Sequence, residues 1–297
     1  MDAANDIAEF LTSRRAKITP EQAGLPSYGK RRVPGLRREE VASLAGMSVE
    51  YYKRLERGNS SGVSELVLEG LARALQLDEA ERSHLFDLVR AAGRAGRGSP
   101  KRSRPVKQTI RPVVQRILDQ ISAPATVRNA RLDYVGGNTL GRALYAPVFD
   151  SRQQPANSAR FTFLDHAAAD FYPDWNRAAA DSVSLLRAEA GRNPDDRELT
   201  ELIGDLTTRS ERFSALWATH NVRWHSTGTK PFHHPVVGDL SLAYEGLELT
   251  ADPGQTLITY TAEPGSTSEQ ALTFLASWAA SPEKPTAHDR ASEKPTT

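Results

Sequence analysis

The stretch Arg38–Arg57 (REEVASLAGMSVEYYKRLER) places the tightest constraint on the fold. Ala42 is followed four positions later by Gly46, and Ser48 comes two residues after the glycine. Two helices that cross at a steep angle need a small residue where they touch, and the turn between them needs a residue that tolerates positive φ. Ser48 is placed to cap the second helix through its hydroxyl. The segment therefore predicts two short helices joined by a tight turn.

The polar side chains of this segment predict an interface with duplex DNA. Residues 28–104 carry a net charge of +6, from 16 Lys and Arg against 10 Asp and Glu. Cations, hydroxyls and hydrogen-bonding groups on one face suit phosphates and base edges. An αα-hairpin that only packs a helical bundle uses the same alanine and glycine, but the charge and the face together favour a helix-turn-helix. The predicted DNA contacts are Arg37, Arg38, Ser48, Glu50, Tyr51, Lys53 and Arg54.

Composition divides the chain into two folded units. The segment Gly93–Pro105 (GRAGRGSPKRSRP) contains five Arg and Lys and no acidic or large apolar residue, so it has nothing to bury in a core. We predict a helix-turn-helix domain over residues 1–92, a basic linker over 93–105, a second domain over 106–280 and a disordered polar tail over 281–297. Helical periods in the first unit predict helices at Asn5–Ala16, Pro20–Gly24, Arg37–Ala45, Ser48–Arg57, Ser64–Leu75 and Asp78–Val89.

The second unit mixes helical and strand-like patterns, which predicts an α+β domain. The predicted helices are Pro112–Ser122, Asn138–Tyr145, Asp174–Ala190, Asp196–Thr207, Glu211–His220 and Thr267–Ala280. The predicted strands are Thr126–Asn129, Leu132–Val135, Val222–Thr227, Val236–Leu249 and Thr256–Thr261. The adjacent His233, His234 and Pro235 are expected at the entry to a strand.

The sequence resembles the MmyB-like transcription regulators. The stretches RRVPGLRREEVASLAGMSVEYYKRLERG and LEGLARALQLDEAERSHLFDL resemble their Xre-type helix-turn-helix. The resemblance continues through NSARFTFLDHAAADFYPDW, LLRAEAGRNPDDRELTELIGDLTTRSERFSALWATHNV, HHPVVGDLSLAYEGLEL and GQTLITYTAEPGS. It implies an all-α, lambda-repressor-like domain followed by an α+β PAS-like domain over residues 106–280 that binds a small apolar, fatty-acyl-like ligand. One departure is visible, because family members often carry Trp-Asn where this chain has Gly137 and Asn138.

Aromatic residues crowd into the second unit, and some of them are candidates for a ligand pocket. Apolar walls with a few convergent polar groups are typical of such sites, although aromatic residues are more often ordinary core and the polar groups structural hydrogen-bonders. Asn138, Arg160 and His234 are polar groups that could orient an acyl head group. The candidate ligand residues are Tyr134, Asn138, Phe161, Phe163, Phe171, Trp175, Trp217 and His234.

The sequence argues against several other classes of protein. The absence of cysteine excludes a disulfide framework, and the four histidines 220, 225, 233 and 234 match no metal template, so we expect neither a metal nor another cofactor. No GxSxG, GxxxxGK[ST] or Rossmann fingerprint is present, so we expect no enzyme. No apolar run approaches the roughly 18 residues of a membrane span, and we expect a cytoplasmic protein.

Two other functions stay open for the second domain. It could serve only for dimerisation or partner binding, or it could be an enzyme that acts on an acyl substrate. We expect a homodimer, because one helix-turn-helix covers only a few base pairs and specific affinity usually needs two half-sites.

Overall fold

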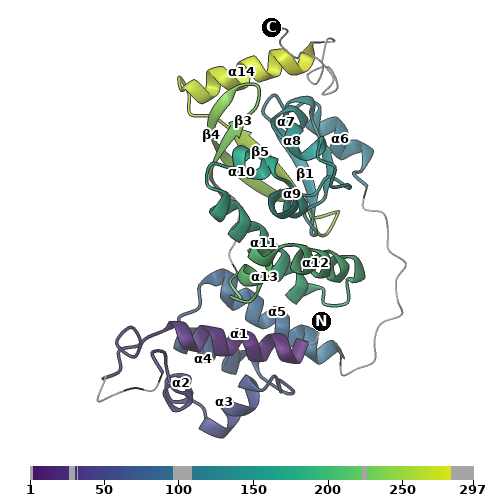
Figure 1. The fold of residues 1–297 in the computed structure, drawn as a ribbon. Helices are drawn as coiled ribbons and strands as arrows, with labels where there is room; N and C mark the ends of the chain where they lie inside the picture. The colour runs from purple at the N-terminus through teal and green to yellow at the C-terminus, as the bar shows by residue number, and fades with distance from the viewer. Residues whose placement is uncertain (1–2, 27–30, 32, 96–108, 223–225, 282–297) are drawn as a thin grey trace.

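The computed structural model describes residues 3–26, 31, 33–95, 109–222 and 226–281, as an all-helical N-terminal domain and an α+β C-terminal domain (Figure 1). Most of the predicted linker and nearly all of the predicted tail fall on residues 96–108 and 282–297, outside the described residues. The two-domain class predicted from the sequence, all-α and then α+β, is confirmed.

The described residues of the N-terminal domain form five helices: α1 (Ala3–Lys17), α2 (Arg38–Leu44), α3 (Val49–Glu56), α4 (Glu65–Ala74) and α5 (Glu79–Ala95). Phe10, Leu36, Val41, Tyr52 and Leu85 are fully buried in its core. The apolar faces that these helices bury are the ones that the sequence periodicity marks, which is why five of the six predicted helices are found within a few residues of their expected bounds.

Two predictions in this region are wrong. The helix expected at Pro20–Gly24 is a series of turns, closed where Gly24 adopts a φ of 70°. Helix α5 runs on to Ala95, into the stretch predicted as linker. Alanine is a strong helix former, and Ala91 is buried, so the helix continues past the glycine at position 93.

The C-terminal domain is built on one five-stranded antiparallel sheet in the order β2-β1-β5-β4-β3. Its strands are β1 (Ala125–Asn129), β2 (Tyr134–Gly137), β3 (Thr227–His234), β4 (Gly238–Glu248) and β5 (Gln255–Thr261). The sheet packed with helices confirms the α+β architecture that the resemblance implied.

The sequence misplaced strand β3. It was expected to end at Thr227, but the structure begins it there. Consequently His233 and His234 lie at the exit of a strand and not at its entry, opposite Asp239 and Gly238 across the turn into β4. Gly238 has a φ of 72°, which makes this tight turn possible.

Nine helices accompany the sheet in the described part of this domain. They are α6 (Pro112–Leu118), α7 (Thr139–Leu144), α8 (Ala146–Phe149), α9 (Ser158–Leu164), α10 (Ala167–Phe171), α11 (Trp175–Arg192), α12 (Arg197–Arg209), α13 (Glu211–Trp217) and α14 (Thr267–Ala280). Helices α8, α9 and α10 were not predicted, because four to seven residues are too few for a helical period to show.

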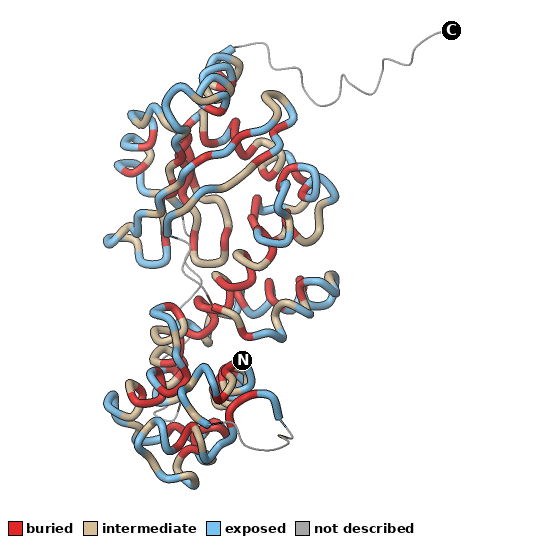
Figure 2. The backbone as a smooth tube through the Cα atoms, turned by 90° about the vertical axis from the view of Figure 1, so that its left-hand side faces the viewer, coloured by how far each residue is buried: buried red, intermediate tan, exposed pale blue. Residues whose placement is uncertain are grey.

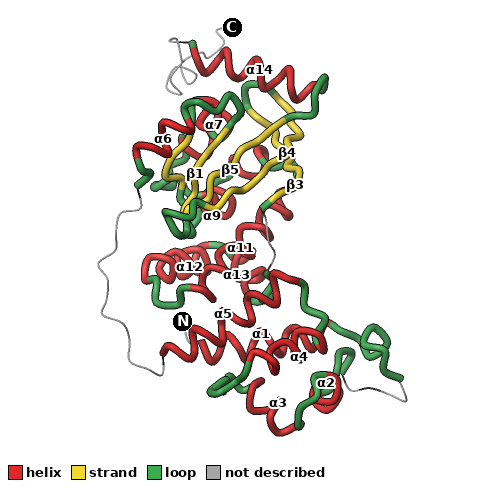
Figure 3. Tube along the Cα trace, turned by 180° about the vertical axis from the view of Figure 1, so that it is seen from behind, coloured by secondary structure: helices red, strands yellow, loops and turns green. Residues whose placement is uncertain are grey.

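The two faces of the sheet have different cover. Val127 and Leu257 point to the face on which α6 packs, seen at one side of the sheet in Figure 3. The next residues along these strands, Arg128 and Ile258, point to the opposite face, toward α11.

Helix α11 makes contacts in both domains. It packs on α9 and α13 within its own domain, and it also packs on α5 of the N-terminal domain. Figure 2 shows buried residues inside each domain and along the helices where the two meet. The DNA-reading candidate α3 lies at the far end of the N-terminal domain, away from this junction (Figure 1).

Candidate DNA interface and ligand cavity

The local chemistry of the α2–α3 segment has the form that its sequence predicts. Ala42 is fully buried, and the backbone of Gly46 adopts a φ of 69° in the turn. The Ser48 hydroxyl accepts a hydrogen bond from the backbone N–H of Tyr51 at 3.2 Å, which caps α3. Two helices joined by this turn form a helix-turn-helix, in which α3 is the recognition helix.

Of the predicted DNA contacts on α3, Glu50 and Arg54 are exposed and Tyr51 and Lys53 are half-buried, and each pairs with a neighbour. The Lys53 ammonium pairs with Glu50 at 2.7 Å, and the Arg54 guanidinium lies 4.7 Å from the centre of the Tyr51 ring. These contacts hold the side chains in a row along the exposed face of α3. Their roles as DNA contacts remain predictions.

A buried carboxylate that the sequence analysis missed organises this motif. Glu56 is 6% exposed and accepts hydrogen bonds from Arg15 of α1, at 2.6 Å, and from Arg38 of α2. Arg38, predicted to contact DNA, therefore also joins α2 to α3. Nothing in the sequence distinguishes Glu56 from the exposed acids around it except its place on the apolar side of α3.

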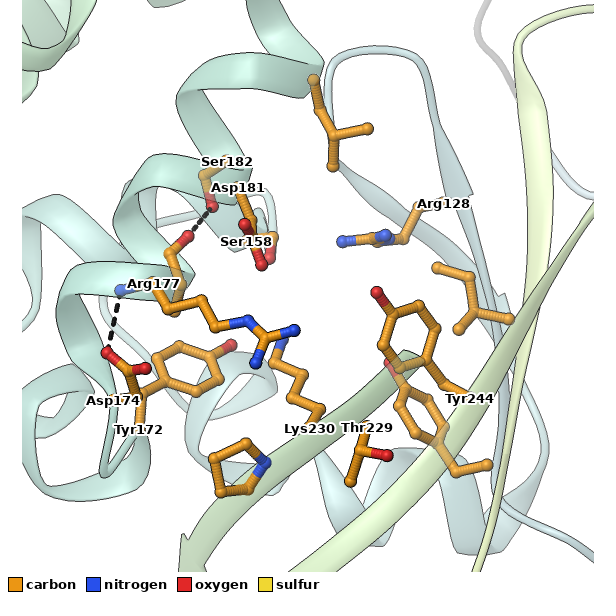
Figure 4. A pocket seen from close by; sticks show the side chains of 15 residues that line it. Arg128, Ser158, Tyr172, Asp174, Arg177, Asp181, Ser182, Thr229, Lys230 and Tyr244 are labelled. Carbon is orange, nitrogen blue, oxygen red and sulfur yellow. Dashed lines mark hydrogen bonds between the residues drawn. The ribbon is translucent and has the colours of Figure 1, made fainter. Parts of the chain in front are cut away.

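A cavity lies in the C-terminal domain between the sheet and α11 (Figure 4). The sheet contributes residues from β1, β3, β4 and β5, and the helical side contributes α11 and the starts and ends of neighbouring helices. Polar and charged side chains predominate in its lining, which consists of Arg128, Ser158, Tyr172, Asp174, Arg177, Ala178, Asp181, Ser182, Leu185, Thr229, Lys230, Pro231, Tyr244, Ile258 and Tyr260.

Two cations, Lys230 and Arg128, line this cavity. The Lys230 ammonium lies 4.5 Å from the centre of the Tyr172 ring and 5.4 Å from that of Phe232, and it makes no hydrogen bond within the described chain. The Nε atom of Arg128 is buried and likewise has no hydrogen-bond partner there. Burial, and then the nearby Arg128 charge, lower the pKa of Lys230 to about 7 against the attraction of Asp181.

Tyrosine hydroxyls surround the same cations. Those of Tyr145 and Tyr260 hydrogen-bond to each other at 2.6 Å. Those of Tyr134 and Tyr172 are buried and form no hydrogen bond of good geometry in the described part of the chain, although Ser158 lies close to both. Burial raises the pKa of Tyr172 well above its usual value, so this hydroxyl keeps its proton and is available to donate.

None of the eight candidate ligand residues is among those that line the cavity. Asn138 caps α7 and its amide donates to the carbonyls of Ile121 and Ala123 at 2.9 and 2.8 Å. Trp175 donates from Nε1 to the carbonyl of Thr162 at 2.9 Å, and Arg160 pairs with Asp205 at 3.8 Å.

The other candidates belong to packed clusters. His234 hydrogen-bonds to the Ala143 carbonyl at 3.0 Å, and its Nδ1 accepts from Val236 at 3.2 Å. The aromatic candidates are distributed over two cores: Tyr134, Phe161 and Phe171 beside the sheet, and Phe163 and Trp217 in the cluster that α9, α11, α12 and α13 form. The structure thus gives these residues packing roles, and ligand contact by any of them remains a prediction.

The histidines also have separate partners. His220 is 3.2 Å from Glu9, and His233 is 2.6 Å from Asp239, whereas His225 lies outside the described residues. In the part of the chain that the structure describes, no group of three His, Asp or Glu side chains is placed to hold a metal ion.

Charged and polar groups line the junction between the two domains. Arg14 of α1 pairs with Glu81 of α5 and donates to the carbonyl of His220 beyond α13. Arg187 of α11 lies 3.9 Å from the centre of the Trp217 ring and 3.0 Å from His220 Nδ1.

At its C-terminal end, α11 approaches α5 closely. A Cβ atom on Gly191 would be 2.6 Å from Cε1 of His84, a distance that real contacts do not reach. Burial, followed by the charges of Arg187 and Arg14, lowers the pKa of His84 to about 3. The ring therefore stays neutral in this junction.

Family models match both halves of the chain. A model described as a helix-turn-helix domain matches residues 7–85, and one described as the MmyB-like transcription regulator ligand binding domain matches residues 110–275, more than half of the chain. No curated protein matches the chain. No helix among the described residues is both long enough and apolar enough to cross a membrane.

A helix-turn-helix joined to a ligand-binding domain defines a DNA-binding transcription regulator. Within that class, the chain belongs to the MmyB-like transcription regulators, as the resemblance predicted.

Proposed function

We propose that a small molecule bound in the cavity changes how the helix-turn-helix domain binds DNA. The observation that carries this proposal is the double role of α11. Asp181, Ser182 and Leu185 of this helix line the cavity, and Gly191 of the same helix rests on His84 of the DNA-binding domain. Leu185 and Gly191 are six residues apart, roughly 9 Å along a helix axis, so a small tilt of α11 moves both ends.

The contact between α11 and α5 provides a direct route for the signal. A ligand shifts an equilibrium only when it binds the two arrangements unequally. Ligand contacts with the first half of α11 would favour one docking angle on α5, and the buried groups at the junction make that angle specific.

DNA recognition is proposed for the exposed face of α2 and α3. The contacts are Arg37, Arg38, Ser48, Glu50, Tyr51, Lys53 and Arg54, in a homodimer that reads two half-sites. The ligand domain acts as a sensor in a cytoplasmic regulator and not as an enzyme, so the bound molecule should leave unchanged. The family resemblance supports a fatty-acyl-like ligand, and the cations of the cavity favour one with an anionic head group and a short chain.

Reciprocal titration tests the coupling. The molecule that copurifies is identified by mass spectrometry, and an operator is selected from random DNA. Titration calorimetry then measures ligand affinity with and without operator. We expect the two affinities to differ by a factor that corresponds to about 1–3 kcal/mol, and DNA affinity to change by the same factor when ligand is added.

Two results would contradict the proposal. Equal ligand affinities in both titrations would leave the C-terminal domain as a dimerisation or partner module, and chemical turnover of the bound molecule would make it an enzyme. A Gly191→Leu variant provides the matched test, because it pushes α11 off α5 without touching the cavity lining. It should keep ligand affinity and lose the effect of DNA on it.

A further inference from the structure

The charged residues that line the cavity do not cancel and leave one excess positive charge. Arg128, Arg177 and Lys230 face Asp174 and Asp181, which leaves a net charge of +1 on the lining residues. Asp174, Arg177 and Thr229 are exposed and form the rim, whereas Arg128 and Lys230 are half-buried. In Figure 4, Lys230 lies near Tyr172, and Arg128 lies on the opposite wall of the cavity. The two less exposed cations therefore approach the cavity from different sides.

Unused hydrogen-bond donors line the same cavity. Arg128 Nε and the hydroxyl of Tyr172 are buried without a hydrogen bond of good geometry among the described residues, and the Lys230 ammonium lies over the rings of Tyr145, Tyr172 and Phe232. Buried donors are nearly always satisfied in folded proteins, so several unsatisfied ones around one cavity indicate an acceptor that comes from outside the chain. The guanidinium and the ammonium only donate and carry positive charge, and the hydroxyl can donate, so an oxyanion is the acceptor that fits them best.

We propose that the cavity binds the carboxylate of a small organic monoanion between Arg128 and Lys230, with the Tyr172 hydroxyl as a third donor. This inference rests on the proposed function for its regulatory meaning, but the binding itself does not depend on DNA. One negative charge balances the lining, and a planar carboxylate matches the parallel donors of a guanidinium.

The size of the cavity limits the rest of the ligand. Its volume of about 50 Å³ is far below the roughly 300–1,000 Å³ of pockets that enclose drug-sized ligands. The carboxylate lies between the two cations, and only a short or flat body fits against Tyr244 and Tyr260 toward the rim. The tail of a long acyl chain would have to extend past the rim.

Benzoate and its neutral isostere benzamide provide the direct test. Calorimetry and thermal unfolding are measured on the full-length protein without DNA, after bound small molecules have been removed by refolding. Benzoate should bind and raise the midpoint of unfolding, and benzamide should bind at least tenfold more weakly, because one charge-assisted contact is worth about that factor. Decanoate carries the same carboxylate on a long chain and should bind more weakly than benzoate.

Two variants locate the site. Lys230→Met removes the charge but keeps the length of the side chain, and Tyr172→Phe removes only the hydroxyl. Each should weaken benzoate binding by roughly tenfold. The matched control Lys53→Met removes a lysine from the recognition helix and should leave benzoate affinity unchanged while it weakens DNA binding. Circular dichroism checks that each variant folds.

Each outcome decides the inference. Equal binding of benzoate and benzamide, tighter binding of decanoate, or benzoate affinity unaffected in both variants would overturn it. Benzoate binding that depends on Lys230 but has no effect on DNA affinity would sustain the ligand class and overturn the proposed regulatory function. If a different, uncharged ligand changed DNA affinity, the proposed regulatory function would hold and the proposed ligand class would be wrong.

Discussion

The two domains differ in how their buried charged side chains are partnered. In the DNA-binding domain, the buried carboxylate of Glu56 is held by Arg15 and Arg38 and ties three helices together. In the ligand-binding domain, Arg128 and Lys230 line a cavity, and Arg128 Nε has no hydrogen-bond partner among the described residues. Paired charges stabilise a scaffold, whereas unpaired ones cost stability and persist where a ligand completes them. The contrast separates a structural network from a binding site.

The largest expected effect tests the paired side of this contrast. Glu56→Gln removes the charge and leaves two arginines without their partner. Breaking a buried ion pair typically costs about 3–5 kcal/mol, and the partial exposure of Arg38 places the expected loss near the lower figure. Denaturant unfolding followed by circular dichroism measures the free energy of unfolding.

The matched control for this variant is Glu50→Gln on the exposed face of the same helix. Its ion pair with Lys53 lies at the surface, so its loss should change stability by less than about 1 kcal/mol. Equal losses in the two variants would show that Glu56 is not a structural centre of the motif.

The next effect concerns the reading of bases by α3. Arg54→Ala should weaken binding to a selected operator by about 1–3 kcal/mol and relax specificity at one base step, because an arginine that pairs with a guanine edge contributes that much. Quantitative gel shifts on operator variants measure both quantities. A uniform loss on all sequences would make Arg54 a phosphate contact, and Arg197→Ala on the exposed face of α12 controls for charge alone.

The sequence predicts the DNA-binding motif well because its determinants are local. Ala42, Gly46 and Ser48 act within a few residues of their own positions, through helix contact, turn conformation and capping. The same holds for Ser64, Asp174 and Ser210, which cap α4, α11 and α13. Interactions between residues only a few positions apart can be predicted directly from the sequence.

The ligand cavity could not be predicted in the same way, because its residues meet only in three dimensions. Arg128 and Lys230 come from strands about a hundred positions apart and look in sequence like ordinary solvent-facing residues. Conversely, Asn138, Trp175 and His234 looked like ligand groups among apolar neighbours, but each has a hydrogen bond to the backbone of its own domain. Which polar groups lack partners is a property of the fold.

A smaller expected effect concerns Lys230 in the cavity of the ligand-binding domain and the pH dependence of stability. With a pKa near 7 in the folded protein and about 10.4 when unfolded, Lys230 binds its proton less tightly in the folded state. The unfolded chain therefore holds more protons between these values, so stability should rise from pH 7 to pH 9, by up to about 1 kcal/mol per pH unit once partial exposure is discounted. Lys230→Met should flatten this rise without lowering stability at pH 7. Unfolding at several pH values measures both, and an unchanged slope in the variant would place the cause elsewhere.

The smallest expected effect is a difference in the sign of the stability change when each of two helical glycines is replaced by alanine. In Gly204→Ala on α12, the added methyl group meets nothing within 4 Å, and the gain in helix propensity should stabilise the protein by up to about 1 kcal/mol. In Gly191→Ala on α11, the same methyl group meets the buried ring of His84 at 2.6 Å, so either α11 or α5 has to move. We expect this variant to be less stable than the parent and to show a weaker effect of ligand on DNA affinity, although its cavity is intact. Thermal unfolding and the reciprocal titration measure the two effects. Stabilisation by both substitutions, with coupling unchanged, would mean that α11 does not press on the DNA-binding domain, and the signal would then have to travel through the linker.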